Sequence, residues 1–179
     1  MSTVTTSKPT ADHSQEFEGL FRDHYLLVYR TACVITGSPE DAEDVLQTIF
    51  LRLMRRSVPP DICKNPKGYF YRAAVHLSLD TIRSRRREVL TADFEPIAGH
   101  VHAEAANEHD ALGQQLIDML AQLSPRTVEI VTLRYVHDYR ESDIAKLLGV
   151  SRGTVAVTLF RARVRLRKLR RLSAFGEQT

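Results

Sequence analysis

Three times along the chain, a residue that caps helices stands directly before a proline, at Ser38-Pro39, Asn65-Pro66 and Ser124-Pro125. Ser and Asn side chains accept a hydrogen bond from the first turn of a helix, and proline is preferred at the first helical position. After each pair, apolar residues recur every three or four positions, which is the spacing of an amphipathic helix. No stretch alternates apolar and polar residues as a half-buried strand does, so the sequence predicts an all-α protein.

The predicted helices form two groups. Between them, residues 88–108 contain Pro96, Gly99 and little periodicity, and a flexible tether of this length allows the two groups to lie far apart. We therefore predict two small helical domains joined by a flexible linker. The predicted boundaries are a disordered lead over 1–15, a first domain over 16–88, an acidic linker over 89–110, a second domain over 111–173 and a tail over 174–179.

Charge is strongly segregated, although the net charge is only +3. Residues 40–44 carry four acids in five positions, and residues 83–87 carry four arginines in five. Residues 161–172 contain seven bases and no acid. Any one of these blocks is compatible with a solvated helix face, but two basic blocks separated by an acidic linker favour nucleic acid as a partner.

Other classes of protein lack support in the sequence. No apolar run approaches the roughly 20 residues of a membrane-spanning helix, and the N-terminus has no apolar leader, so we expect a cytoplasmic protein. There is no histidine at metal-ligand spacing, no glycine-rich phosphate loop and no nucleophile elbow. We expect no catalytic residues, no cofactor and no metal.

The most specific motif has the spacing of a helix-turn-helix over residues 141–161. Ala145 is small enough for a second helix to cross closely, Gly149 suits a left-handed turn, and Ser151 can cap the second helix. In such motifs the first residues of the second helix face base edges in the major groove of DNA. The residues predicted to bind DNA here are Arg152, Gly153, Thr154, Ala156, Val157, Thr158, Phe160 and Arg161.

A second constellation mixes aromatic and basic residues over 65–87. Aromatic rings stack on unpaired bases at about 1–3 kcal/mol per base, and basic side chains attract phosphates, so this mixture is typical of single-strand binding. Helical aromatic residues are also common in cores, and Phe70 is expected there.

Together these pieces resemble the extracytoplasmic-function (ECF) subfamily of bacterial RNA polymerase sigma factors. The matching stretches are residues 17–56, which include DAEDVLQ, residues 65–87, and residues 123–169. The resemblance implies that the first domain binds the polymerase clamp and melts the −10 promoter element, while the second reads the −35 element. The implied partners are core RNA polymerase, promoter DNA and, as in many family members, an anti-sigma factor.

The resemblance also assigns residues. The predicted polymerase-binding residues are Asp41, Ala42, Glu43, Asp44, Val45, Gln47 and Phe50, in an acidic segment that would meet a basic coiled coil. The predicted −10 DNA-binding residues are Lys67, Tyr69, Arg72, His76, Asp80, Arg83, Arg85 and Arg86.

The sequence departs from the family pattern at several of these positions. Tyr69 stands where the family most often has Trp, and His76 stands where Asn is usual. Ala156 and Val157 replace a more usual basic residue and Ser. Because these two side chains offer no hydrogen bonds, we expect −35 recognition to depend more on DNA shape and phosphates.

Two other functions remain open at this point. A stand-alone helix-turn-helix regulator would explain the second domain but not the segment over 40–47. A DNA-cleaving recombinase would need a catalytic Tyr or Ser among arginines on a larger domain, and Tyr69 with Arg72 is a weak candidate. Binding to core polymerase separates the sigma factor from the regulator, and a strand-cleavage assay tests the recombinase.

Overall fold

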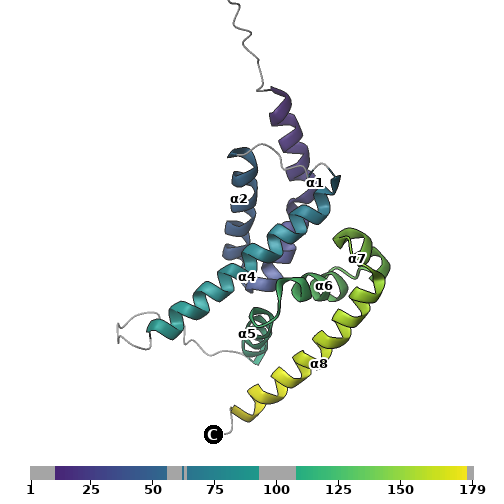
Figure 1. The fold of residues 1–179 in the computed structure, drawn as a ribbon. Helices are drawn as coiled ribbons and strands as arrows, with labels where there is room; N and C mark the ends of the chain where they lie inside the picture. The colour runs from purple at the N-terminus through teal and green to yellow at the C-terminus, as the bar shows by residue number, and fades with distance from the viewer. Residues whose placement is uncertain (1–10, 56–61, 63, 93–107, 177–179) are drawn as a thin grey trace, which may run out of the picture.

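The computed structural model describes residues 11–55, 62, 64–92 and 108–176. Over these residues the chain contains helices and no strand, which confirms the all-α prediction (Figure 1). No helix in the described part combines the length and the apolar character needed to cross a bilayer. The helices are α1 (Ala11–Thr36), α2 (Pro39–Arg55), α4 (Pro66–Ala92), α5 (Glu108–Ala121), α6 (Pro125–Tyr135), α7 (Glu141–Leu148) and α8 (Arg152–Gly176).

The capping residues act as the sequence predicts. Oxygens of the Ser38, Asn65 and Ser124 side chains accept hydrogen bonds from backbone N–H groups three residues later, at 3.3, 2.9 and 3.3 Å. Each cap satisfies one of the backbone donors that a helix N-terminus leaves without an intrahelical partner. The starts of α2, α4 and α6 are therefore fixed by local chemistry.

The first half of the chain packs α1, α2 and α4 around an aromatic core. The rings of Phe50 and Phe70 stack with their centroids 5.2 Å apart, and the ring of His24 lies 4.8 Å from that of Phe70. Phe70 is completely buried, as expected. The buried apolar residues of this cluster are Val28, Ala32, Ala42, Val45, Ile49, Phe50, Leu53, Ile62, Phe70 and Ala74.

The second half packs α5 to α8 on a second core, and that core continues into the first half. One apolar cluster joins Tyr71, Val75 and Leu79 of α4 to residues of α5, α6, α7 and α8. In Figure 1, α5 and α6 lie between the two long helices α4 and α8. The sequence allows the halves to lie far apart, but the structure holds them together through a shared core.

Gly37 marks a close approach between the halves. Its φ of +70° suits glycine, and a Cβ atom built there would lie 2.3 Å from Cδ1 of Ile117 in α5. The same glycine ends α1, so one residue both terminates a helix and admits a side chain from the other half.

Several helices are longer than the sequence indicates. Helix α1 begins at Ala11, inside the predicted disordered lead, and α4 continues to Ala92 because no glycine or proline interrupts residues 69–95. Helix α5 begins at Glu108, inside the predicted linker, and α8 reaches Gly176 in the predicted tail. The remaining parts of the lead, linker and tail lie outside the described residues.

Candidate nucleic-acid and partner interfaces

The helix-turn-helix has the predicted geometry. Gly149 adopts φ 67° and ψ 41°, the left-handed conformation, and its N–H points to carbonyl oxygens of the last turn of α7. The N–H of Val150 donates to the carbonyl of Ala145 at 2.9 Å, which completes a glycine-type helix end. Ala145 is 8% exposed and Val155 is fully buried, so the two helices cross through a small residue and a branched one.

Helix α8 presents its first turns to solvent. Oγ of Ser151 accepts a hydrogen bond from the N–H of Thr154 at 3.0 Å and caps the helix as predicted. Val155, Leu159 and Ala162 bury one face of α8, and the predicted DNA-binding residues lie on the remaining surface. Seven of these eight residues are exposed and Thr158 is half-buried.

The centre of the exposed face of α8 is apolar. Val157, Phe160 and Val164 are 49%, 66% and 52% exposed, and their spacing of three and four residues places them on one stripe. Basic residues flank this stripe on α8. The Arg163 side chain donates from Nε to the hydroxyl of Tyr135 at 2.7 Å, and the exposed Arg161 belongs to the predicted DNA-binding set. The face therefore combines cationic edges with an apolar middle.

The predicted −10 residues follow α4 with different environments. Tyr69 and Arg72 are half-buried near its first turn, and His76 and Asp80 are exposed. Arg83 donates from Nε to the carbonyl of Ala121 at 3.1 Å and from Nη2 to that of Leu123 at 2.8 Å. Arg83, a predicted DNA-binding residue, is therefore hydrogen-bonded to the second half of the chain.

A surface pocket lies where α4 meets the end of α5. Its volume is about 430 Å³, and it is lined by Asp80, Arg83, Arg86, Arg87 and Ala121. Three of these residues belong to the predicted −10 set, so the second half borders that surface directly.

The predicted polymerase-binding residues divide between the core and the surface. Asp41, Ala42, Val45 and Phe50 are buried within the first half. Glu43, Asp44 and Gln47 are exposed on α2. The accessible part of this predicted site is therefore a short acidic and polar strip.

Asp41 is a buried carboxylate that is paired across helices. Both of its carboxylate oxygens lie against the guanidinium of Arg85 in α4. Burial raises the pKa of Asp41 above its usual value, Arg85 opposes that rise, and the nearby acids Asp44 and Glu40 add to it. This pair joins a predicted polymerase-binding residue to a predicted −10 residue.

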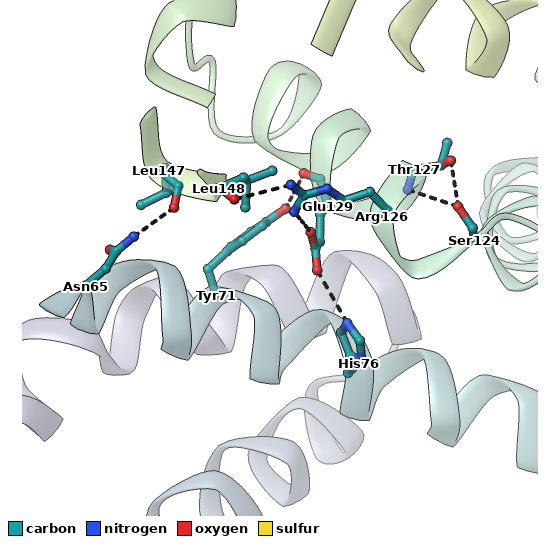
Figure 2. A network of polar contacts seen from close by, with 9 residues as sticks. All are labelled: Asn65, Tyr71, His76, Ser124, Arg126, Thr127, Glu129, Leu147 and Leu148. Carbon is teal, nitrogen blue, oxygen red and sulfur yellow. Dashed lines mark hydrogen bonds and ion pairs between the residues drawn. The ribbon is translucent and has the colours of Figure 1, made fainter. Parts of the chain in front are cut away.

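Sequence reasoning missed a polar network between the halves, which Figure 2 shows around Glu129 of α6. The side chain of Glu129 is 3% exposed; its Oε2 accepts a hydrogen bond from Nη1 of Arg126 at 2.7 Å, and its Oε1 lies 3.4 Å from Nε2 of His76. The hydroxyl of Tyr71 donates to the backbone carbonyl of Glu129 at 2.7 Å. Burial raises the pKa of Tyr71 well above its usual range, so this hydroxyl keeps its proton.

Two further contacts extend the network. Nδ2 of Asn65 donates to the carbonyl of Leu147 in α7 at 2.8 Å, as Figure 2 also shows. Oγ1 of Thr31 in α1 lies 3.0 Å from Nε2 of His137, whose pKa is lowered by burial and by nearby Arg30 and Lys67. The halves are thus joined by hydrogen bonds from α1 and α4 as well as by apolar packing.

Comparison with known families gives two matches on this chain. The family described as Sigma-70 region 2 matches residues 20–88, and that described as Sigma-70, region 4 matches residues 113–166. The first match contains α2 and most of α4, and the second contains α6, α7 and the first turns of α8.

Curated relatives agree with these matches. The chain is 32% identical over 155 residues to the ECF RNA polymerase sigma factor SigE of Mycolicibacterium smegmatis, covering 84% of this chain and 60% of that protein. It is 30% identical over 153 residues to the RNA polymerase sigma-E factor of Streptomyces coelicolor, covering 86% of this chain and 85% of that protein.

A solved structure has a similar fold. It contains the sigma factor RpoE in complex with the anti-sigma factor NepR from Bartonella quintana, and the similarity has a TM-score of 0.50 at 22% sequence identity. The match covers 90% of this chain and 98% of that one.

Proposed function

Because the chain belongs to the ECF group of the sigma-70 family, we propose that it binds core RNA polymerase and directs promoter-specific initiation of transcription. The single observation that carries this proposal is the pairing, on one chain, of a region 2 match over α2 and α4 with a region 4 match over the helix-turn-helix. Sigma factors are initiation factors and not enzymes, so the chemistry belongs to the polymerase. The chain acts in the cytoplasm, where that polymerase works.

The proposed polymerase contact is the exposed strip on α2. Glu43, Asp44 and Gln47 present two carboxylates and an amide to solvent, which suits a basic partner surface. Ala42, Val45 and Phe50 act as positioning residues, because their burial fixes the rotation of α2 and hence the direction of the strip. Asp41 contributes through its pair with Arg85.

The proposed −10 contact is the face of α4 that carries Tyr69, Arg72, His76, Asp80 and Arg83. These positions recur at three and four residues, so they lie on one side of the helix. A ring such as Tyr69 can hold a base that has left the duplex, and the arginines attract the adjacent phosphates. Capturing such a base offsets the few kcal/mol that unstacking costs.

The proposed −35 contact is the exposed face of α8. Arg152 and Arg161 flank a surface whose centre is formed by Val157 and Phe160. Apolar side chains in a major groove contact the methyl group of thymine, whereas arginines contact guanine or phosphate. We therefore expect thymine at the positions that face Val157 and Phe160, supplemented by phosphate contacts and DNA shape.

An anti-sigma factor is a further proposed partner. The similar sigma factor from Bartonella quintana is bound to one in its crystal structure, and this supports the proposal through fold alone.

A pull-down with core polymerase tests the function. Asp44→Arg reverses the charge of the exposed strip and is expected to abolish retention of the chain by core polymerase while leaving its affinity for duplex DNA unchanged. Glu18→Arg is the matched control, because it makes the same charge change at an exposed acid of α1. A wild-type chain that binds duplex DNA but ignores core polymerase would contradict the proposal and favour the stand-alone regulator. Transcription from a promoter library would then identify the preferred elements.

A further inference from the structure

A surface pocket of about 520 Å³ lies where α1, the first turn of α4 and the loop between α6 and α7 meet. The N-terminal end of α4 lies beside α7 in this region (Figure 1). Binding sites for small molecules usually have volumes of about 300–1,000 Å³, so the pocket is large enough for such a ligand. Apart from Lys67, none of its lining residues belongs to a predicted binding set.

Two cationic side chains converge on the pocket from different helices. Arg30 of α1 and Lys67 of α4 are both exposed, and within the described residues neither makes an ion pair or a side-chain hydrogen bond. Nζ of Lys67 lies 5.2 Å from the centroid of the Tyr139 ring, which lines the same pocket. Both cations act on one imidazole, because after burial it is Arg30 and Lys67 that lower the pKa of His137. This part of the pocket is therefore suited to an anionic group.

Lys67 lies on the opposite side of α4 from the proposed −10 contact. At about 100° per residue, Lys67 is about 200° around the helix from Tyr69, whereas Arg72 and His76 share the side of Tyr69. A strand that lies along the −10 face therefore runs on the other side of α4 from this pocket. This position favours a small molecule as the occupant of the pocket.

The other polar groups of the pocket are hydrogen-bond acceptors. Asp23 and Asp138 are exposed, and neither carboxylate forms an ion pair in the part of the chain that the structure describes. The single hydroxyl proton of Thr31 goes to the carbonyl of Leu27 at 2.7 Å, so Nε2 of His137 is the donor in its 3.0 Å contact with Oγ1 of Thr31. The lowered pKa of His137 keeps the ring neutral at about pH 7, which leaves Nδ1 as an acceptor. Acceptors of this kind suit the hydroxyl groups of a sugar.

The loop that forms one wall of the pocket is held in place by hydrogen bonds. The N–H of His137 donates to the carbonyl of Thr132 at 3.2 Å, and the N–H of Tyr139 donates to that of Leu133 at 2.9 Å. Nη1 of Arg134 donates to the carbonyl of Tyr139 at 3.3 Å. Because the wall is already ordered, a ligand does not have to order it on binding, and this favours affinity.

We propose that this pocket binds a phosphorylated small molecule that carries hydroxyl groups, which is the chemistry shared by sugar phosphates and nucleotides. Arg30 and Lys67 bind the phosphate group, and Asp23, Asp138 and His137 accept hydrogen bonds from the hydroxyl groups. The volume of the pocket equals that of about 17 water molecules at about 30 Å³ each, so a free phosphate ion would fill only a small part of it. This inference goes beyond the proposed function and does not depend on it.

Isothermal titration calorimetry of the full chain tests the proposal with ribose 5-phosphate and with AMP. Adenosine, which lacks the phosphate, and inorganic phosphate, which lacks the hydroxyl groups, are the comparison ligands. We expect each of the two esters to bind at least about tenfold more tightly than either comparison ligand, because each comparison ligand loses hydrogen bonds to charged groups. The ester that binds more tightly shows whether the ligand is a sugar phosphate or a nucleotide.

Two variants place the binding in this pocket. Arg30→Gln and Lys67→Gln each remove a cation from an exposed side chain, so both should retain their helix content in circular dichroism. We expect each to weaken binding of the esters about five- to thirtyfold, from the usual strength of a hydrogen bond to a charged group at an exposed site. Arg22→Gln removes the same charge from an exposed position of α1 outside the pocket, and this matched control is expected to change nothing. The imidazole resonances of His137 should shift when either ester binds the wild type.

Several results would overturn this proposal. Failure of both esters to bind would do so, as would binding that leaves the His137 resonances unmoved or that is equal in Arg30→Gln, Lys67→Gln and wild type, because the ligand would then lie elsewhere. Equal affinity for inorganic phosphate would mean that the pocket holds an adventitious ion only, and equal affinity for adenosine would mean that the phosphate is not bound. Weaker binding of an oligothymidylate strand by Arg30→Gln, with neither ester bound, would assign the pocket to nucleic acid instead. All of these measurements are made without polymerase, so the proposed function and this inference can fail separately.

Discussion

Replacing Arg85 by alanine should destabilise the protein by leaving a buried carboxylate without its cation. The Asp41 side chain is 9% exposed and both of its oxygens face the Arg85 guanidinium, whereas the Arg85 side chain is 55% exposed. Arg85→Ala therefore removes a charge from solvent-accessible surface but strands the other charge in the interior.

The magnitude follows from that asymmetry. An exposed ion pair contributes about 0–1 kcal/mol, and a buried charged acceptor that loses its donor costs about 1–3 kcal/mol. Because solvent screens the half-exposed Arg85, we expect a loss of about 1–2 kcal/mol at about pH 7. For a chain of this size that corresponds to a fall in Tm of about 2–8 °C.

The stability deficit of Arg85→Ala should also depend on pH in a definite direction. The pKa of Asp41 is raised in the folded state by burial, and Arg85 opposes the rise, so the pKa of Asp41 is higher still in Arg85→Ala. A carboxyl with a raised folded pKa weakens the fold when it is ionised, and the penalty disappears as the pH falls through that pKa. The deficit of the variant should be full at about pH 7 and should shrink towards about pH 4.

Urea unfolding of wild type and variant across this pH range measures the effect. Arg86→Ala, which removes the same charge at the exposed neighbouring position, is the matched control and should cost less than about 0.5 kcal/mol. Asp41→Asn combined with Arg85→Ala should lose less than the sum of the single changes, because the pair is coupled. The reasoning fails if Arg85→Ala matches Arg86→Ala at neutral pH, or if its deficit stays constant down to acid pH.

Three further predictions concern the core, the turns and the −35 surface. Phe70→Ala should cost about 3–5 kcal/mol in urea unfolding, because Phe70 is fully buried between aromatic rings, and a loss below about 1.5 kcal/mol would contradict that packing. Gly149→Ala should lower the free energy of unfolding by about 1–2 kcal/mol, because alanine is strained at its positive φ. Gly37→Ala should lower it further, because the added methyl group would also meet Ile117. Equal losses in the two variants would refute the close approach at Gly37. Arg161→Ala should weaken binding to a preferred duplex by about 1–3 kcal/mol in fluorescence anisotropy, and an equal loss on every duplex would assign Arg161 to phosphate instead of a base.

Local signals predicted most of the fold. Ser38, Asn65, Ser124 and Ser151 start helices where the sequence indicates, because a cap acts through hydrogen bonds within three residues of itself. The left-handed Gly149 was predictable for the same reason. The C-terminal end of α4 was less predictable, since its last turns continue only because no glycine or proline breaks them.

The contacts between the halves were not predictable from the sequence. Glu129 lies in α6 between residues that are buried. A single acid in such a helix is normally predicted to face solvent. Its partner His76 is 53 residues away in α4, and no periodicity connects the two. The predicted polymerase-binding segment receives two different predictions for the same residues. Its apolar period predicts that Val45 and Phe50 face a core, and the structure confirms this. The resemblance to the family assigns the same two residues to a partner surface.

Arg83 connects the contact between the two halves to the proposed −10 surface. In this structure its guanidinium donates to two carbonyls at the end of α5, where the helix dipole concentrates partial negative charge. A DNA phosphate is a full negative charge and accepts the same two donors more strongly. The two carbonyl groups therefore bind the Arg83 guanidinium more weakly than a phosphate would. We therefore expect Arg83→Ala to weaken both the contact between the halves and the binding of DNA. Urea unfolding measures the first effect and fluorescence anisotropy with DNA measures the second, and a variant that loses neither would contradict both roles.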